Sequence, residues 1–122
     1  MSKPRDLMLT AVLSAFLGGT AVWTAGGAAL PTKAVLENAK VRVTEITSGV
    51  GSLRERGVRA TDQVIVFLDD CRYERLDPAT GAKTIRERKS GDVIWHDKGE
   101  DAPQLTNAGS KPYRTVVIEL KK

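Results

Sequence analysis

Cysteine and histidine are almost absent from this sequence of 122 residues, which holds one of each, Cys71 and His96. A single cysteine excludes an intramolecular disulfide, so we expect a small buried side chain at Cys71, with an intermolecular disulfide as the less favoured alternative. A single histidine excludes an imidazole-rich site for a first-row metal, which needs about three protein ligands. The sequence also lacks a nucleophile elbow and a phosphate-binding loop. These absences exclude the commonest kinds of catalytic site.

Aromatic residues make up only 5% of the chain, and its charges are mixed. The net charge is +4 at pH 7, but basic and acidic residues alternate in stretches such as "TIRERKSGD". A nucleic-acid-binding protein would instead show a basic stripe with interleaved aromatic residues. We therefore expect no nucleic-acid partner and an ordinary solvated surface. The slight excess of positive charge would assist contact with an anionic ligand or membrane.

The first thirty residues have the layout of a secretory signal. Lys3 and Arg5 precede an uncharged stretch from residue 7 to residue 30, whose small residues offer a cleavage site near Ala28 or Ala29. The stretch is also long enough to span a bilayer, so an uncleaved membrane anchor is the alternative. We predict export through residues 1–30, which makes the protein periplasmic or secreted, or membrane-anchored by residues 7–30.

Strand patterns dominate the chain after residue 40. Residues 31–40, "PTKAVLENAK", have weak helical character and are predicted to form a linker or short helix. Six strand signals follow: "VRVTEIT", the strongly apolar "QVIVFLDD", a hairpin turning at "DPATGA", "DVIWH", a short strand and turn in "PQLTNAGSKP", and "YRTVVIEL". The last run has one apolar face and one mixed face, as expected for a strand with one side on a core. Residues 41–122 are thus predicted to be an all-β antiparallel barrel or sandwich.

Three stretches carry a resemblance to a known family. They are "VRVTEITSGVG", "DQVIVFLDD" with its hairpin, and "SGDVIWHDKGEDAPQLTNAG" followed by "PYRTVVIELKK". In order and spacing they resemble the cupins, which are small jelly-roll barrels. The resemblance implies a jelly-roll antiparallel barrel over residues 41–122. It also implies a homodimer, because cupin-like domains commonly pair through their sheets.

The metal motifs of that family are degenerate here. Metal-binding cupins carry G-x5-H-x-H-x3,4-E-x6-G and G-x5-P-x-G-x2-H-x3-N. With Gly49 as the leading glycine, Glu55 and Gly57 stand in place of the first two histidines, and Asp62 takes the glutamate position. In the second motif Ala102 replaces the ligating histidine. The resemblance therefore implies a barrel that has lost its metal ligands, and no metal or cofactor is expected.

Four residues are candidate ligand contacts: Glu55, Asp62, Trp95 and His96. The two carboxylates would lie at the position where cupins hold their metal. His96 either ends a strand in a hydrogen bond to a neighbouring carboxylate, or lies at the barrel mouth as a ligand contact or proton-transfer group. Trp95, on the opposite face of the same strand, is expected to fill the core or to line the cavity.

Three arginines, Arg54, Arg56 and Arg59, cluster in the degenerate first motif. The simpler interpretation is a solvated loop. The alternative is that an arginine enters the space left by the metal, where its fork could bind a carboxylate or pair with Glu55 or Asp62.

The leading hypothesis is an exported, metal-free barrel that binds a small organic ligand inside or a partner on its outer face. The alternative is an atypical cupin enzyme, either metal-dependent or a metal-free isomerase or lyase, in which Glu55, Asp62 and His96 converge inside the barrel. Catalysis is the less favoured of the two. A third hypothesis is a structural or interaction protein of the cell envelope, held by an uncleaved N-terminal helix.

Overall fold

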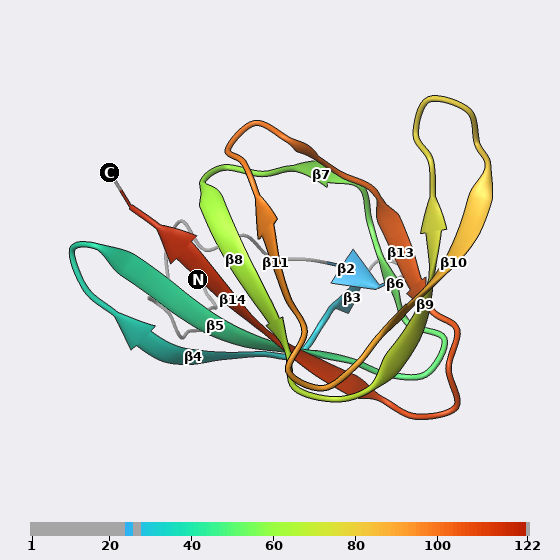
Figure 1. Cartoon of the computed structure of the whole chain (residues 1–122), viewed down its shortest axis with the longest axis horizontal. Coiled ribbons are helices and arrows are strands. Elements are labelled where there is room, and N and C mark those ends of the chain that lie inside the picture. Colours follow the sequence, from blue (N-terminus) through green and yellow to red (C-terminus); the bar gives the residue numbers. More distant parts are fainter. Residues whose placement is uncertain (1–23, 26–27, 122) are drawn as a thin grey trace, which may run out of the picture.

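Two antiparallel sheets form most of the fold in the computed structural model, which describes residues 24–25 and 28–121 (Figure 1). These residues form strands and turns and no helix. The five-stranded sheet has the order β11 (Val93–His96), β8 (Asp62–Phe67), β14 (Tyr113–Leu120), β5 (Val41–Ser48) and β4 (Thr32–Glu37). The four-stranded sheet has the order β10 (Lys83–Arg88), β9 (Cys71–Leu76), β13 (Gln104–Asn107) and β6 (Leu53–Arg54). Two short pairs complete the fold, β12 (Asp101–Ala102) with β7 (Gly57–Val58) and β2 (Thr24–Ala25) with β3 (Ala28–Ala29).

The all-β prediction is confirmed, and its longer strands lie close to the predicted positions. The hairpin of β9 and β10 turns at the predicted "DPATGA". There the Asp77 carboxylate accepts a hydrogen bond from the Ala79 amide at 2.8 Å, and Gly81 adopts a φ of +75°. An aspartate that bonds the backbone two residues later and a glycine in the left-handed region are the usual means of closing such a turn.

The linker or short helix predicted at residues 31–40 is wrong. Thr32–Glu37 forms the edge strand β4, which pairs antiparallel with β5 and has a bulge between Ala34 and Leu36. Weak helix propensity in a short segment is easily overridden by backbone pairing to an open sheet edge. Leu30, 5% exposed, belongs to the hydrophobic core. The barrel therefore includes residues 30–40 and does not begin at residue 41.

The predicted signal or anchor falls largely on residues 1–23 and 26–27, which lie outside the described residues. Export and anchoring remain predictions. Among the residues that are described, no helix has the length and apolar character needed to cross a membrane.

The hydrophobic core lies between the two sheets. Three of its members, Phe67, Tyr73 and Tyr113, form an aromatic cluster with ring centroids 6.3–6.5 Å apart. Their rings are stacked, and those of Phe67 and Tyr73 are almost parallel. The other buried members of this core are aliphatic: Leu30, Ile46, Ile65 and Val117.

The outer face of the five-stranded sheet is unusually apolar. In β14 the mixed face, with Val117 and Glu119, is buried, whereas Ile118 on the apolar face is only half-buried. On β11, Val93 and Trp95 lie outside, 60% and 51% exposed. Strand register brings Trp95 opposite Val64, and Val64 opposite Ile118. The prediction that Trp95 fills the core or lines the cavity is therefore wrong, because its strand turns Ile94 and His96 inward. The homodimer stays a prediction.

Stability measurements on two aromatic truncations test this assignment of faces. We expect Phe67→Ala to lower the free energy of unfolding by about 3 kcal/mol, because it removes a buried ring from the core. Trp95→Ala should cost less than about 1 kcal/mol, since the side chain is half exposed. Urea unfolding of both variants supplies the comparison. An equal loss from the two would mean that Trp95 is covered in solution.

Candidate functional site

A cavity of about 250 Å³ lies inside the barrel, between the two sheets. Pockets for drug-sized ligands usually measure roughly 300–1,000 Å³, so this one suits a smaller molecule. Its walls combine core aromatic and aliphatic side chains with five arginines, one histidine and two carboxylates. The cavity is therefore partly apolar and strongly cationic.

The register of the five-stranded sheet arranges the inner residues in rows across the cavity wall. His96 lies opposite Gln63 in one row, Ile94 opposite Ile65 in the next, and Phe67 belongs to the third. The inner face therefore changes from polar through aliphatic to aromatic along the strands. This gradient follows directly from the two-residue alternation of side chains in a strand.

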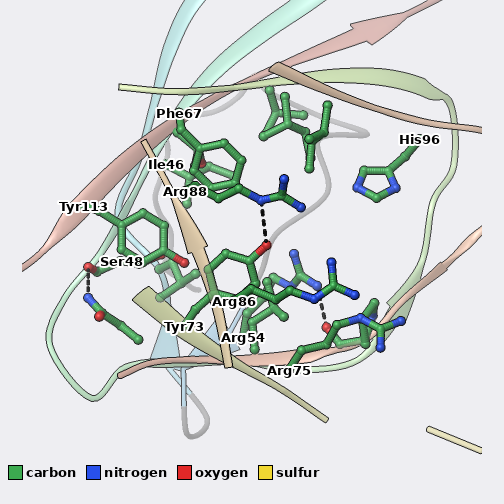
Figure 2. A pocket seen from close by; sticks show the side chains of 18 of the residues that line it. Ile46, Ser48, Arg54, Phe67, Tyr73, Arg75, Arg86, Arg88, His96 and Tyr113 are labelled. Carbon is green, nitrogen blue, oxygen red and sulfur yellow. Dashed lines mark hydrogen bonds between the residues drawn. The ribbon is translucent and has the colours of Figure 1, made fainter. Parts of the chain in front are cut away.

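The four-stranded sheet supplies four of the five arginines: Arg54, Arg75, Arg86 and Arg88. Arg75 and Arg54 flank Leu105 across β9, β13 and β6, and Arg86 lies opposite Tyr73. Figure 2 shows the aromatic cluster on one side of the cavity, with His96 and the guanidinium groups of Arg54, Arg75 and Arg86 toward the other side. The two sheets thus place positive charge and aromatic surface at different ends of one cavity.

Arg59 is the most deeply buried cation of the site, at 4% exposure. It follows β7, where its amide donates to the Glu100 carbonyl at 3.0 Å and its carbonyl accepts from the Gly99 amide at 2.8 Å. Its side chain donates from Nη1 to Gln63 Oε1 at 3.0 Å, while its Nε is buried with no hydrogen-bond partner. Among residues 28–121, no carboxylate lies within 4.0 Å of this guanidinium. Arg59 therefore has an unused donor inside the cavity.

Arg54 shares this cavity, and its guanidinium donates from Nη2 to the Pro103 carbonyl. Burial, followed by the positive charge of Arg59, lowers the pKa of Arg54 to about 10. Burial also lowers the pKa of Arg59. The charges of Glu100 and Asp101 oppose the shift at Arg59. The positive charge of Arg59 thus disfavours the charged form of Arg54, and an anion between the two guanidiniums would relieve that repulsion.

The two carboxylates that line the cavity bind other partners. Glu100 accepts at 3.1 Å from His96 Nδ1, and its side chain is 47% exposed. Asp101 forms an ion pair with Arg56 at 2.9 Å, in which the Arg56 side chain is largely solvated and that of Asp101 is half-buried. These carboxylates leave the charge of Arg59 without a direct partner.

Arg88, also on β10, contacts the aromatic cluster. Its Nε donates to the Tyr73 hydroxyl at 3.3 Å, and its guanidinium carbon lies 5.8 Å from the centroid of the Phe67 ring. The hydrogen bond with Tyr73 raises the pKa of Arg88. This guanidinium is thus held against aromatic side chains.

Of the four residues predicted as ligand contacts, only His96 lines the cavity. Glu55 is exposed, and Trp95 lies on the outer face, where its indole donates to Asp97 at 2.8 Å. Asp62 accepts from the Lys98 amide at 2.8 Å and does not line the cavity. The predicted convergence of Glu55, Asp62 and His96 is therefore wrong. In the extended chain at β6, Arg54 points inward, so its neighbour Glu55 points outward.

Each of the two interpretations of His96 is correct in part. The imidazole bonds a neighbouring carboxylate, that of Glu100, and it also lines the cavity. The solvated-loop interpretation holds for Arg56 but is wrong for Arg54 and Arg59, which are in the cavity.

Sequence reasoning missed Arg75, Arg86 and Arg88. Their signal was present in the two-residue spacing of "YERL" and "TIRER", which places Tyr73 with Arg75, and Arg86 with Arg88, on shared strand faces. That spacing could not indicate which face is inside, because arginines are ordinarily assigned to the solvent side.

The fold and the cavity together define a small cupin-type barrel, and comparison with solved structures shows the cupin fold. A cupin domain from Bordetella pertussis Tohama I shares 18% identity at a TM-score of 0.67, covering 85% of this chain and 100% of that one. A polyketide cyclase from Streptomyces resistomycificus shares 14% at 0.60, covering 75% and 64%. A DMSP lyase from Ruegeria pomeroyi shares 12% at 0.57, covering 76% of this chain and 47% of that one.

No protein-family model and no curated protein matches the sequence itself. At such low identity the structural likeness establishes the fold alone.

The cavity residues do not fit the metal that cupins often hold. Across the described residues, no three side chains of His, Cys, Asp or Glu gather in a metal-binding arrangement. Ala102, at the position of the family's second-motif histidine, is fully buried and has no donor atom. Guanidinium groups cannot ligate a cation, and they repel one.

Cys71 offers no nucleophile for this site. It does not line the cavity, and its partly buried side chain packs against the core. Burial raises the pKa of the Cys71 thiol to about 11.

The rate of alkylation tests whether the pKa of the Cys71 thiol is raised. At pH 8 a thiol of pKa about 11 carries roughly a hundredth of the thiolate of one at the ordinary 9.0. Folded protein should therefore react with iodoacetamide at least about 10-fold more slowly than the same protein in urea, as followed by mass spectrometry. Equal rates in the two states would contradict the assignment.

The pH dependence of stability tests the surroundings of His96. Burial, followed by the charges of Arg59 and Arg54, lowers the pKa of His96, although the bond to Glu100 opposes this. The unfolded chain then binds the proton more readily, so stability is full above the ordinary pKa of about 6.5 and falls as the pH drops below it. Glu100, whose pKa is also lowered, contributes only at more acidic pH. The loss of melting temperature between pH 7.5 and 5.5 should be smaller in His96→Gln, and an unchanged loss would contradict this account.

Proposed function

We propose that the protein is a small-molecule-binding module that takes up an organic anion inside its cupin barrel. The observation that carries this proposal is Arg59, a buried cation with an unpartnered Nε in a cavity lined by four further arginines. A buried donor without a partner costs roughly 1–3 kcal/mol, and a charged one costs more. A ligand anion would satisfy it with a charge-assisted hydrogen bond, the strongest kind that a guanidinium forms.

The size of the site supports a small ligand. The cavity of about 250 Å³ excludes extended polymers, and its apolar wall gives the ligand a surface to bury. The export predicted from residues 1–30 and the homodimer implied by the family resemblance belong to this proposal as its untested parts.

A second candidate function rests on the pair formed by His96 and Glu100. A histidine 3.1 Å from a carboxylate at the edge of a cavity has the geometry of an acid–base pair. Cyclase and lyase structures are among the cupin folds similar to this one. In this candidate the pair would move a proton on the bound anion, so His96→Gln would abolish turnover and retain binding.

Calorimetry on the purified protein, without a His tag and in low-chloride buffer, tests anion binding. The probes are benzoate, hexanoate, succinate, phenyl phosphate and inorganic phosphate, each also titrated while thermal unfolding is followed. At least one probe should bind and raise the melting temperature with concentration. Arg59→Gln should weaken that binding roughly 10- to 100-fold, as expected for loss of a charge-assisted hydrogen bond.

Two controls separate lost binding from lost folding. Arg72→Gln removes the same charge from an exposed position on β9, the strand that carries Arg75, and should leave affinity unchanged. Arg59→Gln without ligand should melt no lower than the wild type, because it removes one of two mutually repelling buried cations. Absence of binding by every probe, or equal affinity in Arg59→Gln, would reject the proposal.

A further inference from the structure

The two ends of the cavity differ in chemistry, and their separation sets the shape of a ligand that contacts both. Phe67 and Gln63 lie at the two ends of the inner face of β8. They are four residues apart, a span of roughly 13 Å at about 3.3 Å per residue. Gln63 holds Arg59 at 3.0 Å, whereas Phe67 belongs to the aromatic cluster. A ligand that satisfies both ends carries its charge at one end and an apolar body at the other.

The cationic end suits one planar carboxylate. Arg54 and Arg59 bring two guanidiniums to the same part of the cavity, and such planar forks match carboxylates and phosphates. Phosphate sites are commonly built from backbone amides at helix N-termini or glycine-rich loops. Residues 28–121 contain no helix that could provide one.

The aromatic end suits an uncharged ring. Phe67, Tyr73 and Tyr113 present a stacked aromatic wall, flanked by Ile46 and Val117. Aromatic rings favour offset or edge contacts with other rings. Arg88 at this end already bonds the Tyr73 hydroxyl and lies over the Phe67 ring. An uncharged ring would leave those contacts in place.

We infer that the ligand class is a small aromatic monocarboxylate, bound with its carboxylate on Arg59 and Arg54 and its ring toward Phe67, Tyr73 and Tyr113. This inference rests on the proposed function, since it specifies the anion for the same cavity. The head group supplies orientation and the ring supplies buried apolar surface, so both parts of the molecule are needed for affinity.

A matched set of probes separates the two parts. Benzoate is compared by calorimetry with benzamide, which keeps the ring and loses the charge, and with acetate, which keeps the carboxylate and loses the ring. Phenyl phosphate changes the head group, terephthalate adds a second carboxylate, and cyclohexanecarboxylate replaces the flat ring. We expect benzoate to bind at least about 10-fold more tightly than each of the other five probes.

Two variants connect these preferences to the ends of the cavity. Arg59→Gln should remove most of the preference for benzoate over benzamide while leaving benzamide affinity unchanged. Phe67→Leu should reduce the preference for benzoate over cyclohexanecarboxylate, and its thermal unfolding shows whether the fold is retained. Arg72→Gln, the exposed control, should retain both preferences.

The outcomes distinguish this inference from the proposal beneath it. Tighter binding of phenyl phosphate, terephthalate, acetate or cyclohexanecarboxylate than of benzoate would overturn the aromatic monocarboxylate and leave an anion-binding cavity. Equal affinity for benzamide and benzoate would overturn the inference, because it would mean that the negative charge of the ligand does not contribute to binding. Failure of all six probes, together with inorganic phosphate, succinate and hexanoate, would overturn the inference and the proposed function together.

Discussion

The confinement of two buried guanidiniums to one cavity is the constraint on which the rest of this structure depends. Arg54 and Arg59 both lie in the barrel interior, and burial with mutual repulsion lowers the pKa of Arg54 to about 10. Removing such charges from water costs several kcal/mol per ion unless partners compensate. The nearby carboxylates of Glu100 and Asp101 instead pair with His96 and Arg56. A buried guanidinium such as that of Arg59, whose Nε has no hydrogen-bond partner, departs from the usual rules of stability, and such departures are concentrated at functional sites.

The remainder of the barrel holds this charge in place through strand register. Leu105 lies between Arg54 and Arg75, so the four-stranded sheet fixes two arginines in one row. The five-stranded sheet fixes Gln63, which orients Arg59. Strand β4 pairs with β5 at the edge of the five-stranded sheet, and Leu30, just before β4, packs in the core. A shift of register by one residue would turn every inner side chain outward. The cavity is therefore specified by backbone pairing as much as by its own side chains.

The sequence predicted the strands well and the faces of those strands poorly. Short β-branched runs bounded by turn residues located β5, β8, β9, β10, β11 and β14, because that signal is local. The inner face is set by contacts between distant strands, which no local pattern contains. Trp95 was expected inside since aromatic residues are usually buried, yet it lies outside, and Arg54 and Arg59 lie inside against their ordinary preference. β4 was missed because its exposed residues are held by pairing to β5 rather than by their own propensity.

The polar interior of the barrel and the apolar outer face of the five-stranded sheet are related. The interior contains arginines, a histidine, Gln63 and Glu119, while valines, Ile118 and Trp95 cover the outer face of the five-stranded sheet. A barrel with polar side chains at interior positions has fewer of those positions for apolar packing, and its remaining apolar side chains occupy the outer positions of the same strands. The polar interior and the apolar exterior thus both follow from the alternation of side chains along each strand. The aromatic cluster of Phe67, Tyr73 and Tyr113 then has two roles at once, because it is the main part of the hydrophobic core and also a wall of the cavity.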